Sequence, residues 1–211
     1  MFVSLLQMAT KYSLSDVREQ LVEDLKGAYP TKWEDFEAAN ILGEDVFGSP
    51  KPHPNAVLSL FLEQNVKFAL PFAAYRAGLG GPSALVNDGP GTIIPSLTLV
   101  SVTHGIGEMR GMMILAAYSV VYMGGLEVCV EMECTLSVDT NHIESRMEAL
   151  EKVFHVIAGR SEGDMLSSLS LGTLVCVDCA TLLEKAHLDY RKELVWAALP
   201  SLLSWEGWEG V

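Results

Sequence analysis

Apolar residues that recur three and four positions apart predict a series of short helices in residues 1–79. The second of these helices, between Ser13 and Pro30, has one apolar face and is expected to be a core helix. That face consists of Val17, Leu21, Leu25 and Ala28. Glycines and prolines between residues 43 and 54 predict a loop, after which helical spacing resumes over residues 55–64 and 68–79.

The composition changes at Gly80, where we expect a boundary between two segments. Turn-forming residues at 80–82 and 87–91 are followed by a stretch rich in Ile, Val, Thr, Met and Gly. Further on, Glu127, Glu131 and Glu133 alternate with apolar residues, which is typical of a half-exposed strand. Residues 80–140 are therefore expected to form strands or a small β hairpin, or to be poorly ordered.

Helical spacing returns in residues 141–211, where Ile143, Met147, Leu150 and Phe154 share one face. The fold class predicted from the whole pattern is mainly α, a bundle of short helices. Its three expected segments are residues 1–79, 80–140 and 141–211.

An uncharged, apolar stretch covers residues 111–126. It is shorter than the ~20 apolar residues that a helix needs to cross a bilayer. We therefore expect it to be buried core. The first residues of the chain also lack the basic region of a secretory signal.

The chain is acidic, with 14 Lys and Arg against 27 Asp and Glu, for a net charge of −13. Between Arg76 and Arg146 the only cationic side chain is Arg110, so the sequence has no basic stripe for nucleic acid or an anionic membrane. Four cysteines and the absence of an Asn-x-Ser/Thr acceptor favour a reducing compartment, the cytoplasm or the nucleus.

Motifs for catalysis are missing from the sequence. It contains no Gly-x-Ser-x-Gly, no His-Glu-x-x-His and no phosphate-binding Gly-x4-Gly-Lys-Ser/Thr loop. No catalytic residue and no cofactor is expected. One alternative is a nucleotide-dependent enzyme, in which a strand at Leu97 to Val102 leads into a turn with Gly105, Gly107 and Gly111.

Cysteines offer a second alternative, a small module stabilised by zinc. Cys176 and Cys179 are three residues apart, and Cys129, Cys134 and His187 could supply further ligands. Burial as small apolar side chains accounts for Cys176 and Cys179 equally well.

Ordered matches to one family run along both ends of the chain. They lie at residues 6–12, 17–18, 28–36 and 57–75, and again at 176–179, 191–196, 199–200 and 205. Together these stretches resemble the C-terminal part of fungal BTB/POZ-domain proteins. The resemblance implies an adaptor that dimerises and, in some members, serves cullin-type ubiquitin ligases. The strands and first helix of that family's BTB fold have no counterpart here.

The expected function is protein–protein interaction of the BTB/POZ adaptor type, without catalysis. The partners are other proteins, and self-association is left open. Candidate contact residues are the tryptophans near the C-terminus, since exposed tryptophan is frequent at binding hot spots. They are Trp196, Trp205 and Trp208.

Overall fold

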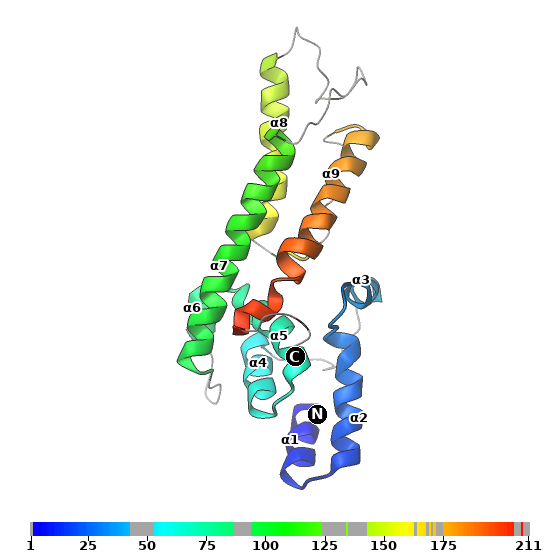
Figure 1. The fold of residues 1–211 in the computed structure, drawn as a ribbon, viewed down its shortest axis with the longest axis vertical. Coiled ribbons are helices and arrows are strands. Elements are labelled where there is room, and N and C mark those ends of the chain that lie inside the picture. Colours follow the sequence, from blue (N-terminus) through cyan, green and yellow to red (C-terminus); the bar gives the residue numbers. More distant parts are fainter. Residues whose placement is uncertain are drawn as a thin grey trace. The chain divides into compact units, whose positions relative to one another are not determined.

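A computed structural model describes residues 2–42, 53–86, 94–123, 134, 143–162, 164–167, 169, 171, 175–204 and 208 (Figure 1). These residues are mainly helical, which confirms the prediction of a mainly α protein, although α7 (Ser96–Tyr118) and α8 (Ile143–Glu162) are longer than the short helices expected. No strand occurs among them, so the expected hairpin is not supported. Residues 127–133, whose alternation predicted a strand, lie outside the described residues.

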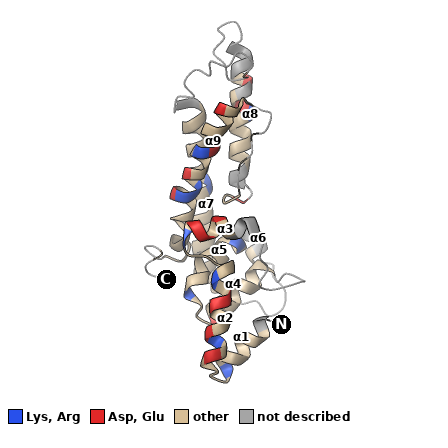
Figure 2. Cartoon of the chain, turned by 90° about the vertical axis from the view of Figure 1, so that its right-hand side faces the viewer, with Lys and Arg blue, Asp and Glu red and all other residues tan. Residues whose placement is uncertain are grey.

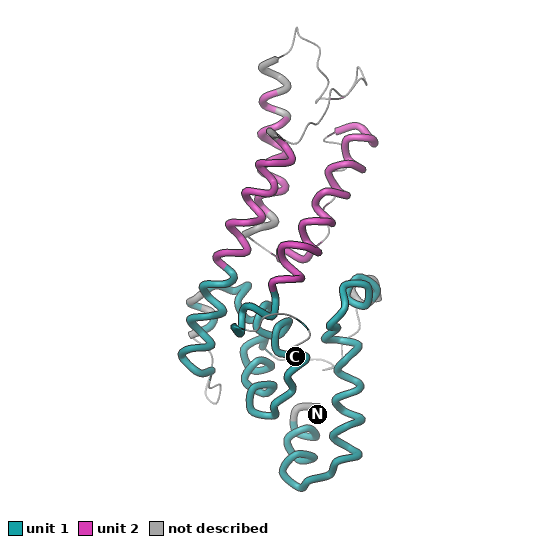
Figure 3. Tube along the Cα trace, in the orientation of Figure 1, with its two compact units in different colours: residues 1–106, 199–211 teal, residues 107–198 magenta. Residues whose placement is uncertain are grey.

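The chain divides into two compact units, drawn in two colours in Figure 3. Unit 1 consists of residues 1–106 and 199–211, and unit 2 consists of residues 107–198. The boundary between the units falls inside a helix, α7 (Ser96–Tyr118), and not at Gly80 where the composition changes.

Unit 1 is a group of short helices. Its described elements are α1 (Phe2–Lys11), α2 (Ser15–Ala28), α3 (Trp33–Leu42), α4 (Pro54–Glu63), η1 (Lys67–Ala69), α5 (Leu70–Gly78), α6 (Gly81–Val86), the first half of α7, and η5 (Leu199–Leu203). Proline at the start of a helix has the backbone angle that the first turn requires, and this explains the beginnings of α4 and α5.

Aromatic rings fill the core of unit 1 around α4 and α5. Tyr29, which follows α2, meets the ring of Phe61 edge-on with centroids 4.9 Å apart, and the ring of Phe72 at 5.9 Å. Phe36 of α3 packs against Phe72 at 5.7 Å. Edge-to-face pairs of this kind contribute about 0.5–1.5 kcal/mol each beyond the apolar area that the rings bury.

Two glycines allow close contact between α5, α7 and η5. A Cβ atom at Gly78 would lie 2.7 Å from Cγ1 of Ile106 and 2.9 Å from Cγ1 of Val102. A Cβ atom at Gly105 would lie 2.6 Å from Cδ2 of Leu202 in η5. All three distances are shorter than van der Waals contact, so hydrogen is the only side chain that fits at either position without movement of the neighbour.

Unit 2 contains the second half of α7, the π-helical turn η2 (Ser119–Met123), α8 (Ile143–Glu162), α9 (Val177–Tyr190) and the π-helical η4 (Arg191–Trp196). Its core joins residues from each of the first four of these elements. The buried members include Ala117, Val121, Val153, Ile157 and Leu183.

The apolar stretch that follows Gly111 is partly buried. Met113, Ala116 and Ala117 face the core, whereas Leu115 and Tyr118 are exposed. Among the described residues, no helix combines the length and the apolar character that a membrane span requires. The expectation of buried core therefore holds for one side of this helix only.

Candidate functional site

Five large apolar side chains are exposed at the hairpin of α1 and α2. Leu5, Met8, Tyr12, Leu14 and Val17 each leave between 41% and 59% of their surface accessible. We call this set the hairpin face. Single exposed apolar residues are ordinary, but five within 13 consecutive positions of one helical hairpin form a potential binding surface.

Helical spacing explains why three of these five side chains are exposed together. Leu5, Met8 and Tyr12 follow one another at intervals of three and four and lie along one side of the helix. Leu6 and Ala9, which are fully buried, lie on another side and attach α1 to the rest of unit 1. The helix therefore has two apolar sides, of which only one is covered.

Backbone geometry fixes the turn between the two helices. Ser13 has a φ of 52°, in the left-handed region that ends many helices. The N–H of Leu14 donates to the carbonyl of Ala9 at 2.9 Å. The guanidinium of Arg18 donates to the carbonyl of Gln64 at 3.0 Å and so attaches α2 to the end of α4.

The apolar side of α2 is buried at one end only. Leu25 is fully buried and Leu21 and Ala28 are half-buried, but Val17 is exposed. The prediction of a core helix is therefore correct for the C-terminal half of α2 and wrong for its first turn. That first turn belongs to the hairpin face.

Charged residues border the hairpin face. Acidic and basic residues are interspersed along α2 (Figure 2). The ammonium of Lys11 lies over the ring of Tyr12, 5.6 Å from its centroid. Asp16 and Glu19 are exposed beside the face.

The three candidate tryptophans have different positions. Trp196 lies in η4 and is buried, with 4% of its surface exposed. It therefore contributes to packing and does not offer a surface in this structure. Trp208 is half-buried in unit 1, and Trp205 lies outside the described residues, so their role in partner binding stays a prediction.

The glycines proposed for a nucleotide site lie within a helix. Leu97 to Val102 is the first part of α7, and Gly105, Gly107 and Gly111 follow in the same helix. The dinucleotide fingerprint needs a strand, a tight turn and then a helix, so this prediction of a strand and turn is wrong. Gly105 serves close packing against Leu202, while Cβ atoms at Gly107 and Gly111 would meet no atom within 4 Å.

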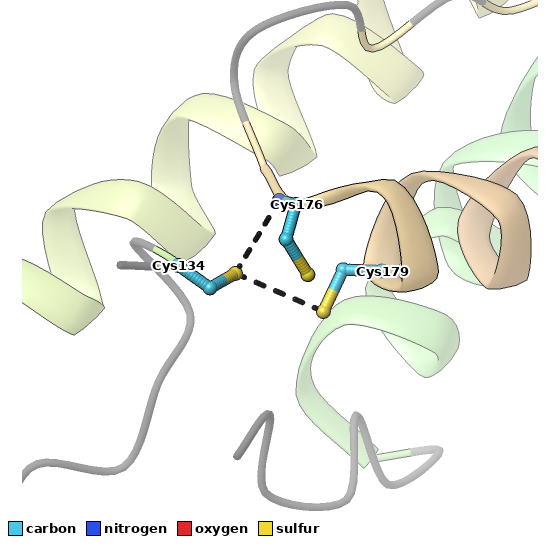
Figure 4. Close-up of side chains that lie close together, drawn as sticks. All are labelled: Cys134, Cys176 and Cys179. Carbon is cyan, nitrogen blue, oxygen red and sulfur yellow. Dashed lines mark hydrogen bonds between the residues drawn. The ribbon is translucent and has the colours of Figure 1, made fainter. Parts of the chain in front are cut away.

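Three cysteines of unit 2 come together at the start of α9 (Figure 4). Cys176 immediately precedes α9, and Cys179 lies in its first turn. The Sγ atoms of Cys134 and Cys179 are 3.9 Å apart, and all three Sγ atoms lie within 4.8 Å of one another. His187, a further candidate ligand, is buried on α9 and does not belong to this group, and Cys129 lies outside the described residues.

No known protein family, curated protein or solved structure matches the chain. The hairpin face and the cysteine group are therefore the features of the molecule that bear on its function.

Proposed function

We propose that this protein acts by binding another protein through the hairpin face, as an adaptor of the BTB/POZ type and without catalysis of its own. The observation that carries the proposal is the exposure of five large apolar side chains on an ordered helical hairpin. The resemblance to BTB/POZ proteins supports it, because one of the matching stretches, residues 6–12, contributes Met8 and Tyr12 to this face, and another, residues 17–18, contributes Val17.

The apolar surface is large enough to contribute to binding. Completing the burial of a half-exposed Leu, Met or Val side chain is worth about 1 kcal/mol. The four aliphatic side chains of the face offer about 4 kcal/mol before the entropy cost of association is subtracted, and the ring of Tyr12 adds to this. This favours a reversible adaptor contact, strengthened by polar and charged contacts at its border.

Charge favours a different protein as the partner over a second copy of this chain. A net charge of −13 on each copy opposes self-association. The exposed carboxylates of Asp16 and Glu19 suit a partner surface whose apolar centre is bordered by lysine or arginine.

Site-specific photo-crosslinking in cells tests the proposal. A photoreactive phenylalanine analogue replaces Tyr12 in the hairpin face, and in a matched control it replaces Tyr118, an exposed tyrosine of α7 that lies in unit 2. We expect a discrete crosslinked partner from position 12 and none of the same mass from position 118. Met8→Glu, which places a charge one helical turn from Tyr12, should abolish the crosslink.

Equal capture from both positions, or capture that persists with Met8→Glu, would contradict the proposal. Light scattering on the purified chain gives a separate readout. A stable dimer that Met8→Glu dissociates would assign the face to a second copy of this chain and overturn the proposed basic partner.

A further inference from the structure

We propose that Cys134, Cys176 and Cys179 bind one zinc ion as thiolates. The site unites a CxxC pair at the start of α9 with a cysteine more than 40 positions earlier in the sequence. It lies wholly within unit 2 and is independent of the hairpin face.

The spacing of the sulfur atoms suits tetrahedral zinc. A Zn–S bond is about 2.3 Å long, so two thiolates on a tetrahedral ion lie about 3.8 Å apart. The Sγ atoms of Cys134 and Cys179 are 3.9 Å apart, and the longest separation in the group does not exceed 4.8 Å. Small rotations of the side chains would bring all three sulfurs to bonding distance of one ion.

The spacing does not match a disulfide. A disulfide bond brings two sulfur atoms to about 2.05 Å, roughly half the separation of Cys134 and Cys179. A redox pair would also use only two of the three cysteines and would leave the third without a role in the chemistry. A metal ion engages all three sulfurs at once.

Local structure favours negatively charged sulfur at this position. Cys176 is the residue that caps α9, and Cys179 lies three residues further in the same helix, where the partial positive charge of the helix N-terminus stabilises anions. The backbone N–H of Cys176 points at Sγ of Cys134 over a distance of 3.5 Å. A donor of this kind stabilises a ligating thiolate.

Burial gives the ion a dry environment with one open side. Cys134 and Cys179 are buried within the core of unit 2, next to Val175 and Leu183. Cys176 is half-buried and leaves a path to solvent. Three thiolates fill three positions of the tetrahedron, and a further ligand fills the fourth.

Zinc fits the ligand chemistry better than a hard cation. Thiolate sulfur binds soft and borderline ions, whereas magnesium and calcium require oxygen ligands. The ion would hold Cys134 against the start of α9. Closing such a long loop stabilises the folded unit and makes the stability of unit 2 depend on metal.

Metal analysis of the full chain tests the inference. The protein is purified under reducing conditions without chelator, and zinc is measured by mass spectrometry of the native protein and by elemental analysis. We expect one zinc ion per chain. After replacement of zinc by Co²⁺, we expect a strong near-ultraviolet thiolate-to-cobalt absorption band.

Variants assign the ion to this site. Cys176→Ser changes the most exposed of the three ligands and should lower zinc affinity by at least about tenfold, because a neutral hydroxyl is a poor ligand for zinc. Cys134→Ser should weaken both the zinc binding and the cobalt band. Val177→Ser introduces serine at an exposed position between the two cysteines of α9 and should leave zinc binding unchanged.

Three results would overturn the inference. The first is a folded wild-type chain that retains no zinc and gives no thiolate band with Co²⁺, a result that does not depend on the folding of any variant. The second is undiminished zinc binding in Cys134→Ser and Cys176→Ser. The third is a chain that retains Cu⁺ in place of zinc.

Discussion

Some glycines of this chain allow close packing between helices and others lie in open space. The neighbouring sequence does not distinguish the two kinds. Glycine was interpreted from the sequence as a marker of turns, and Gly105, Gly107 and Gly111 were assigned to one on that basis. In the structure all three are helical, and Gly105 packs closely against the side chain of Leu202. Only the position of the neighbouring element separates a packing glycine from one that could be replaced.

Alanine substitutions test this difference. Gly78→Ala should destabilise the protein by about 1–3 kcal/mol, because the new methyl group overlaps Val102 and Ile106, whose branched side chains cannot rotate away. Gly111→Ala, which meets no atom within 4 Å in the middle of α7, should stabilise it by up to ~1 kcal/mol. The free energy of unfolding in urea measures both, and equal effects of the two changes would contradict the packing argument.

Cysteine shows how far the sequence could predict the candidate site. The pair Cys176 and Cys179 is visible as a motif, and Cys134 could only be named as one of several further ligands. Its place beside the pair depends on a chain reversal of more than 40 residues, which local patterns do not encode. The same limit applies to Trp196, since its burial is decided by its neighbours in space.

At the scale of the elements, periodicity predicted helices well where polar and apolar residues were clearly separated. The helices around residues 15–28, 54–63 and 143–162 are present as expected. Residues 97–102 have a strand-like composition of Leu, Val, Thr and Ser, but they begin a 23-residue helix. Strand propensity is weak and yields to packing, here between Val102 and α5.

A charge pair on α8 gives a pH-dependent prediction. Lys152 lies one turn after Glu148, with 2.7 Å between Nζ and Oε1, and its hydrogen bond and positive charge lower the pKa of Glu148 below its ordinary value. A carboxyl group with a lowered pKa in the folded state stabilises that state above its unfolded pKa. The contribution disappears as pH falls through the folded pKa.

Titration by NMR measures this effect. The side-chain carbon of Glu148 should titrate at lower pH in the wild type than in Lys152→Met, which keeps the length of the side chain but removes its charge. A Glu148 titration that is the same in both proteins would contradict the assigned cause. High salt should bring the two curves together, because both side chains are exposed.

At the scale of the whole molecule, changes in composition predicted three segments of the sequence. The two compact units of the structure do not coincide with these segments. The change at Gly80 is real in composition, but α6 and the first half of α7 belong to the same unit as the first part of the chain. The last described residues return to the same unit, where Leu199 and Leu202 are buried. No local pattern predicts that return, because it joins parts of the sequence that are about 100 residues apart.

Removing one side chain near the C-terminus should therefore weaken helices that lie far away in sequence. Leu202→Ala should destabilise unit 1 by about 2–5 kcal/mol, because Leu202 is fully buried against Gly105. Amide hydrogen exchange should become faster in α5, which η5 contacts. Leu182→Ala removes an exposed leucine and serves as the control. Unchanged exchange in α5 would show that η5 is not part of the core of unit 1.

The return of η5 to unit 1 also bears on how the protein is made. A ribosome releases the chain from its N-terminus, so α4 and α5 emerge long before their last neighbour exists. All of unit 2, whose residues form one uninterrupted stretch, is also synthesised before Leu202. During synthesis, α5 and the start of α7 therefore expose apolar surface until η5 has left the ribosome, and over this interval a chaperone would protect the nascent chain.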